Sequence, residues 1–149
     1  MFEIESKNPD EITIITKDAN VIFNVAEYEI DGHLAVGKIK GPGEFEIGDV
    51  TIRGVDVGEG RTIYDAEVGG VHVGIIGGIE DGLDDLGMAD ILCTSSVRAV
   101  REISPKLVIA MGNIDGMVSE LKLTARAEKR LKVKNADALP TTLEVVALN

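Results

Sequence analysis

The sequence predicts an α/β layered domain in which β-hairpins come early in the chain and strand-helix-strand crossovers come late. Its 149 residues suit a single domain, 1–149, because a chain of this size buries roughly 70% of the surface that it exposes when unfolded. Hydrophobic residues make up 44% of the chain and aromatic residues only 3%. The core must therefore consist of Val, Ile, Leu and Ala, a composition that suits sheets because β-branched side chains pack well on a pleated surface.

The first forty residues carry two hairpin signals. The segments EITIIT (11–16) and VIFN (21–24) flank the turn KDAN, whose residue types tolerate a reversal of the backbone. The dipeptide Asp31-Gly32 separates AEYEI from HLAVGKI, and Asp-Gly is a common two-residue hairpin loop. We therefore expect a strand on each side of both turns.

Two further ribbons are predicted between residues 43 and 78. In GPGEFEIGDVTIRGV (41–55), apolar and polar residues alternate on both sides of Gly48-Asp49, which gives each strand one apolar face. In the second ribbon, Gly69-Gly70 joins RTIYDAEV to VHVGIIGG, as a tight primed turn requires. The return strand is apolar nearly throughout, which is typical of a strand covered on both faces.

From residue 82 onward, short helical segments alternate with apolar strands. Ser95 or Ser96 can cap a helix that starts near Val97, because a serine hydroxyl accepts from the free N–H groups of the first turn. The order strand-helix-strand implies crossover connections and a mixed sheet. The expected segments are helices in 82–88, 95–103 and 117–131, and strands in 89–95, 106–112 and 141–148.

The charge balance excludes two classes of partner. Acidic residues outnumber basic ones by 26 to 15, for a net charge of -11, which repels phosphate backbones and anionic lipid surfaces. We therefore expect no nucleic acid and no membrane as partner. The basic segment KLTARAEKRLKVK (122–134) is interpreted as an exposed helix face rather than a functional patch. The charged N-terminus shows no signal-peptide core, so a cytoplasmic location is expected.

Four segments resemble the metallo-β-lactamase fold superfamily, specifically its compact branch similar to the ascorbate-phosphate lactonases. The resemblance spans roughly residues 30–149 and implies an αββα sandwich of two mixed β-sheets, here shortened and with few short helices. The segments are GPGEFEIGDVTIRGV, TIYDAEVGGVHVGIIGG, PKLVIAMG and LKVKNADALPTTLEVVAL.

The resemblance also implies a metal site that the sequence does not supply. In active members, a His-x-His-x-Asp-His loop, two further His and a bridging Asp hold the metals, and a metal-bound hydroxide attacks the substrate. This chain has only two histidines, His33 and His72, and no such loop. The loop precedes the GPGE strand in active members, and here the chain before Gly41 is too short to contain it. We interpret this as an internal deletion.

The other implied ligand positions also lack ligands. Gly78 stands where the resemblance places the bridging Asp, and Gly112 stands where it places a His. A further His is implied after Val55, but only Asp56 and Glu59 lie nearby. The sequence therefore predicts no catalytic residue, no metal ligand and no cofactor.

The remaining reactive residues have structural interpretations. His72 lies in a strand and His33 follows a turn, and we expect both to be structural or solvent-facing. Cys93 is the only cysteine, so an intramolecular disulfide and a Cys-rich zinc motif are excluded. It lies in an apolar run and is predicted to be a small buried hydrophobe, with a thiol nucleophile as the minor alternative.

Two clusters in the middle of the chain match no binding motif. The acidic cluster does not have the spacing of an EF-hand; we expect a solvated loop and helix start, with weak calcium or magnesium binding as a minor hypothesis. Glycines at 69, 70, 74, 77 and 78 match neither nucleotide-binding pattern and indicate tight turns beside a neighbouring strand. The acidic cluster comprises Glu80, Asp81, Asp84, Asp85 and Asp90.

The leading functional hypothesis is a degenerate, non-catalytic member of this fold that acts as a binding or assembly module. Because a shortened sandwich exposes edges and apolar faces, we expect a homo-oligomer or a protein partner. The alternative is a metal-dependent hydrolase of lactones or phosphoesters whose site is rebuilt from Asp and Glu or completed by another subunit. A third hypothesis is an acidic regulatory subunit of a ligand-bearing paralogue. The small-molecule ligand stays open.

Overall fold

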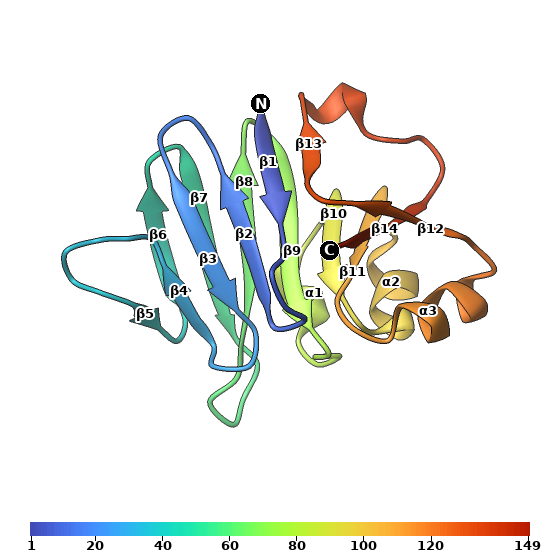
Figure 1. Ribbon diagram of the computed structural model, residues 1–149. Helices are drawn as coiled ribbons and strands as arrows, with labels where there is room; N and C mark the ends of the chain where they lie inside the picture. Colours follow the sequence, from blue (N-terminus) through green and yellow to red (C-terminus); the bar gives the residue numbers. More distant parts are fainter.

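The computed structural model describes residues 1–149 as two β-sheets packed face to face, with three short α-helices against one of them (Figure 1). The strands of the smaller sheet are β1 (Phe2–Glu5), β2 (Glu11–Ile15), β3 (Asn20–Asn24), β4 (Glu29–Asp31), β5 (Ile39–Lys40) and β13 (Leu131–Val133). Their order is β13-β1-β2-β3-β4-β5, and every neighbouring pair is antiparallel.

The larger sheet is mixed. Its strands are β6 (Gly43–Ile47), β7 (Val50–Asp56), β8 (Thr62–Val68), β9 (Val71–Gly77), β10 (Ile91–Thr94), β11 (Leu107–Ala110), β12 (Ala125–Glu128) and β14 (Glu144–Leu148). Their order is β12-β14-β11-β10-β9-β8-β7-β6. Strands β6 to β9 form an antiparallel meander. The neighbouring strands β9, β10, β11, β14 and β12 all run parallel to one another. The predicted crossover half of the domain is confirmed.

The main core fills the space between the two sheets. It contains 24 buried residues, of which 19 are Val, Ile, Leu or Ala, so the core is mainly aliphatic as the composition predicted. Period-two alternation selects them: Ile12 and Ile14 of β2 face Val50 and Ile52 of β7 across the interface as members of this core. The one aromatic pair is Phe23 and Tyr64, whose ring centroids lie 5.5 Å apart.

A second core lies between the larger sheet and the helices α1 (Leu83–Leu86), α2 (Val97–Ile103) and α3 (Ile114–Leu121). β9 contributes to both cores, with Ile75 in the first and Ile76 in the second, so the prediction of a strand covered on both faces is confirmed. The Ser96 hydroxyl caps α2 by accepting from the Ala99 N–H at 3.1 Å, as predicted.

The two-sheet sandwich with few short helices is confirmed, but its layers are sheet, sheet and helix rather than αββα. All three α-helices pack on the larger sheet, and the outer face of the smaller sheet carries side chains such as Glu3, Glu5 and Asn24. A polar sheet face needs no covering layer. The outer face of this sheet is therefore not one of the exposed apolar faces expected of a shortened sandwich.

The predicted helix over 117–131 is wrong beyond Leu121. Lys122 adopts a left-handed conformation with φ 57° and ends α3, and the basic segment that follows forms β12 and β13. The physical reason is pairing with distant strands: β13 extends the smaller sheet beside β1, and β12 extends the larger sheet beside β14. Leu131 and Val133 thereby enter the main core.

The predicted two-residue turn at Asp31-Gly32 is also wrong. β4 pairs with β5 across a wider loop, 32–38, and the turn within it is closed by the Gly37 N–H, which donates to the Leu34 carbonyl at 3.0 Å. The hairpins β2–β3, β6–β7 and β8–β9 are confirmed. Gly69-Gly70 takes the positive φ values of 55° and 80° that a primed turn requires. No helix is both long and apolar enough to cross a membrane.

We predict that Tyr64→Phe raises the free energy of unfolding in urea by about 1 kcal/mol, because the Tyr64 hydroxyl is fully buried without a hydrogen-bond partner. Burial, reinforced by Glu29, raises the Tyr64 pKa to about 12 from 10.0. The wild-type protein should therefore lose stability as the pH rises from 10 toward 12, since the unfolded chain ionises first. Tyr64→Phe should lack this component.

The control for this prediction is Tyr28→Phe, whose side chain is only partly buried; its free energy of unfolding should match the wild type. A Tyr64→Phe protein that is less stable than the wild type would show that the hydroxyl has a partner in solution.

Candidate functional site

The parallel strands β9, β10 and β11 end at one edge of the sandwich, and their loops contact one another there. The Ser95 N–H and the Thr94 hydroxyl both donate to the Gly77 carbonyl, at 3.0 and 2.7 Å, and the Met111 N–H donates to the Thr94 carbonyl at 3.0 Å. Open α/β sheets bind ligands beside the carboxyl ends of their parallel strands. This edge is therefore the candidate site.

The two glycines at implied ligand positions both lie at this edge. A Cβ at Gly78 would lie 3.3 Å from the Ser95 hydroxyl, and a Cβ on the preceding Gly77 would lie 2.9 Å from a methyl group of Val25. Gly112 has a φ of 71°, and a Cβ there would meet only Pro9, at 3.9 Å. The edge is thus closed by an aliphatic side chain near Gly77 and left open near Gly112.

Asp56 is the last residue of β7, and Glu59 lies in the loop between β7 and β8. The Asp56 carboxylate accepts from the Gly58 N–H at 2.8 Å and so stabilises its own turn. Glu59 is exposed at a positive φ of 59°. Arg61 ties this loop to Asp81 through an ion pair of 2.9 Å. Asp56 and Glu59 therefore belong to a turn, and they are not grouped with other side chains into a site.

The two histidines lie far apart in the fold. His33 is exposed in the loop 32–38, where its backbone N–H donates to the Asp31 carboxylate at 2.9 Å. His72 lies near the start of β9, at the end of the strand opposite the candidate site. Its Nδ1 is 3.2 Å from Asp65 Oδ1 and its Nε2 is 3.9 Å from Glu67 Oε2.

Two opposing effects act on Asp65, the partner of His72. Burial raises the pKa of the Asp65 carboxyl, while its hydrogen bond and charge interaction with His72 oppose that rise. A partly buried carboxylate is thus matched by an imidazole on the outer face of the larger sheet. This arrangement fits the structural role predicted for His72.

The acidic cluster predicted between residues 80 and 90 is dispersed among separate partners. Glu80 accepts from the Ser96 hydroxyl, Asp81 pairs with Arg61, and Asp90 accepts from the His72 backbone N–H at 2.9 Å. Asp84 and Asp85 form the first turn of α1, where acids interact favourably with the helix dipole. No three His, Cys, Asp or Glu side chains anywhere in the chain are grouped to hold a metal ion.

The residues at this edge do not fit a zinc site. Zinc in proteins needs three or four His, Cys or carboxylate ligands, whereas glycine occupies the two ligand positions that lie here, and Val25 packs against Gly77, the residue before one of them. Glu80, two residues after Gly78, accepts a hydrogen bond from the Ser96 hydroxyl. No step of metal chemistry can be derived from this set of side chains.

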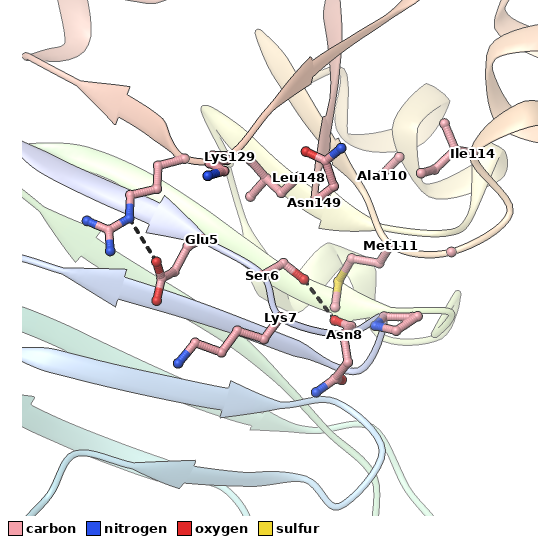
Figure 2. Close-up of a pocket in the computed structure, with 13 residues that line it drawn as sticks. Glu5, Ser6, Lys7, Asn8, Ala110, Met111, Ile114, Lys129, Leu148 and Asn149 are labelled. Carbon is pink, nitrogen blue, oxygen red and sulfur yellow. Dashed lines mark hydrogen bonds and ion pairs between the residues drawn. The ribbon is translucent and has the colours of Figure 1, made fainter.

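A cleft of about 580 Å³ opens beside Gly112 at the same edge. Three of its walls are the β1–β2 loop, the β11–α3 connection and the β12–β13 loop, and the end of β14 completes it. In Figure 2, Ala110, Met111 and Ile114 lie toward one side of the view, Glu5, Lys7 and Lys129 lie toward the other, and Leu148 lies between them, beside Lys129. The cleft is therefore apolar at one end and charged at the other.

Sequence reasoning missed this cleft. Its lining comes from four distant segments, 5–9, 110–114, 129–130 and 148–149, and no local pattern connects them. Lys129 belongs to the basic segment that was interpreted as a helix face. The available signal was Gly112 itself, because a glycine at the end of a buried parallel strand leaves room at the sheet edge.

Cys93 is fully buried in the main core, which confirms the prediction of a small buried hydrophobe. Burial raises the pKa of its thiol far above the usual range, and the thiolate is the reactive form of cysteine. The minor alternative of a thiol nucleophile has no support from this environment.

Thiol labelling tests this environment. We predict that Cys93 of the native protein reacts with a thiol reagent no faster than the protein unfolds, because the reagent reaches it only after opening. In urea, the labelling rate should rise with the unfolded fraction. Rapid labelling of the native protein would contradict the burial of Cys93.

A second prediction concerns the packing that closes the edge. Gly77→Ala should destabilise the protein by about 2–3 kcal/mol, because its Cβ would press on Val25 at 2.9 Å and its φ is 57°. Gly69→Ala is the matched control, with a φ of 55° and no atom within 4 Å, and should cost only about 1 kcal/mol.

Urea unfolding of Gly77→Ala in a Val25→Gly background, which removes the Val25 Cβ at 3.0 Å as well as its methyl groups, completes this test. The added cost of Gly77→Ala should fall there to the value of the Gly69→Ala control, because the contact is gone. Equal costs for the two glycine variants in the wild-type background would contradict the contact.

Comparison with known proteins identifies the fold. No protein-family model and no curated protein sequence matches this chain. A crystal structure described as that of a proposed Zn-dependent hydrolase of the metallo-β-lactamase superfamily, from Thermotoga maritima, superposes with a TM-score of 0.73 at 15% sequence identity. The match covers 99% of this chain and 98% of that chain, so the two chains have the same fold over nearly their full lengths. The chain therefore has the metallo-β-lactamase fold that its sequence motifs predicted.

Proposed function

We propose that this chain is a non-catalytic binding protein built on the metallo-β-lactamase fold, with the cleft beside Gly112 as its binding site. One observation carries the proposal. Where the resemblance places metal ligands, the chain has Gly78 and Gly112, and the backbone beside Gly78 packs against Val25. The edge of the sandwich is thus packed near Gly78 and open at the cleft beside Gly112.

Metal-dependent hydrolysis needs ligands that this edge does not provide, which supports the proposal. Such a site needs several ligands fixed around the metal and one open position for water. The two acids that follow Gly78 most closely in the chain have other partners, since Glu80 accepts from Ser96 and Asp81 pairs with Arg61. Recruiting either of them to a metal would break a contact that holds a loop.

The cleft supports binding rather than a purely structural remnant. Its volume of about 580 Å³ lies within the range of roughly 300–1,000 Å³ for small-molecule sites. Gly112 keeps one wall free of side chain, and the lining combines apolar and charged groups. Sites for small molecules commonly combine an apolar surface with a few polar groups that orient the ligand.

The competing function is a metal-dependent hydrolase of lactones or phosphoesters. The observation in its favour is the structural neighbour, described as a Zn-dependent hydrolase and matched over 98% of its length. In this chain the ligands would have to come from a second subunit or from acids that leave their present partners.

We also propose that the protein self-associates or binds a protein partner in the cytoplasm. The support is local: Leu34 and Val36 are exposed in the loop 32–38, next to the edge strand β5. Exposed apolar side chains beside a free strand edge favour association. Light scattering at micromolar concentration tests self-association, and a monomer that captures no partner would argue against it.

The central test is the metal content of the purified, tag-free protein. We predict a substoichiometric content of zinc, iron and manganese by elemental mass spectrometry, even after growth in medium that supplies all three. The melting temperature should not change with a chelator, because no fold-stabilising ion is removed. One transition metal per chain, together with chelator-sensitive hydrolysis, would overturn the proposal and favour the hydrolase.

A further inference from the structure

We infer that the cleft beside Gly112 takes a small organic anion with an apolar body, whose charged group lies near Lys7 and Lys129. This inference rests on the proposed function and deepens it, because it names the class of ligand for the same site. It rests on the charges, the apolar surface and the ordered loop of the cleft.

The charges of the cleft oppose those of the whole chain. The chain has 26 acidic and 15 basic residues, but the lining of the cleft has three basic side chains, Lys7, Lys129 and Arg130, against the single acid Glu5. A cationic lining in an acidic protein attracts anions to this place rather than to the rest of the surface.

Glu5 is already neutralised within the fold. Arg130 donates to it from Nε at 2.9 Å and to Glu3 from Nη1 at 3.0 Å. Neither Lys7 nor Lys129 is engaged in an ion pair of the structure, and both are exposed. These two ammonium groups are therefore the cations available to a ligand.

The opposite end of the cleft supplies apolar surface. Ala110, which ends β11, and Met111 are buried and contribute 7% and 5% of their surface, and the half-buried Ile114 and Leu148 extend this surface. Gly112 adds no side chain between them. An inorganic ion would leave this surface exposed to water, whereas an organic anion would cover it. The apolar surface thus selects an organic anion.

The loop that presents Lys7 is held in place before any ligand binds. The Ser6 hydroxyl donates to the Asn8 carbonyl at 2.8 Å, as Figure 2 shows, and to the Glu11 carbonyl at 2.9 Å. The Asn8 side chain accepts from the Asp10 N–H at 2.9 Å. A loop that is already ordered loses less conformational entropy on binding, which favours a specific site.

The experiment uses 1-anilinonaphthalene-8-sulfonate, an apolar fluorophore with one anionic group, titrated at low ionic strength into the full chain. We expect saturable binding of one dye per chain. The double variant Lys7→Gln/Lys129→Gln should bind the dye about tenfold more weakly, since two exposed charge interactions are removed. Added salt should weaken binding to the wild type and have less effect on the variant.

Two controls separate the cleft from general dye binding. Lys17→Gln/Lys122→Gln removes two exposed lysines outside the cleft and should leave the dissociation constant unchanged. Octanoate should displace the dye, whereas octanol should displace it less well, because only the former carries the charge. Unchanged melting temperatures of both double variants show that they are folded.

Three results would overturn the inference: no saturable binding by the wild type, equal binding by Lys7→Gln/Lys129→Gln, or an equal loss in both double variants. Metal content measured on the same preparation separates this failure from that of the proposed function. A metal-free protein that does not bind the dye would lack this ligand class but remain non-catalytic. A stoichiometric metal would instead overturn the proposed function, whatever the dye shows.

Discussion

The interface between the two sheets is the constraint on which the rest of the structure depends. It buries 24 residues, and because side chains alternate along a strand, a one-residue slip of any strand would move its apolar set to the outside. Aliphatic burial of this kind is non-directional, so it fixes the layers and the registers but specifies no chemistry. The strand ends, and with them the edge that carries the cleft, are placed by this packing.

Because the packed core is separate from the loops at the strand ends, the fold does not depend on the metal ligands that the resemblance implies. Ligands in such a fold project from loops at the strand ends, and the core makes no demand on them. Glycine at 78 and 112, where the resemblance implies ligands, leaves the side chains of the core unchanged. The edge does show an adjustment, since Val25 packs against Gly77 and Val57 lies close to Gly82. Aliphatic contacts thus occupy part of the rim of the sandwich.

The sequence predicts what depends on neighbouring residues and fails where distant strands decide. The hairpin around Gly69-Gly70 and the cap at Ser96 follow from a few adjacent residues. The segment 122–134 becomes two strands because β1 and β14 offer it hydrogen bonds and an apolar face, and neither partner is adjacent in sequence. The cleft could not be predicted from the sequence for the same reason, because residues as far apart in the chain as 5 and 149 line it.

The charged groups of the cleft relate this edge of the sandwich to the proposed function. In a metal-dependent hydrolase the metal ion has two roles, since it attracts an anionic substrate and also activates water. The ammonium groups of Lys7 and Lys129 can supply only the first of these, because an ammonium ion has no vacant position at which water could bind and lose a proton. A cleft with these lysines and with Gly112 retains attraction for an anion and room for its body. This difference is why we propose binding without turnover for the cleft.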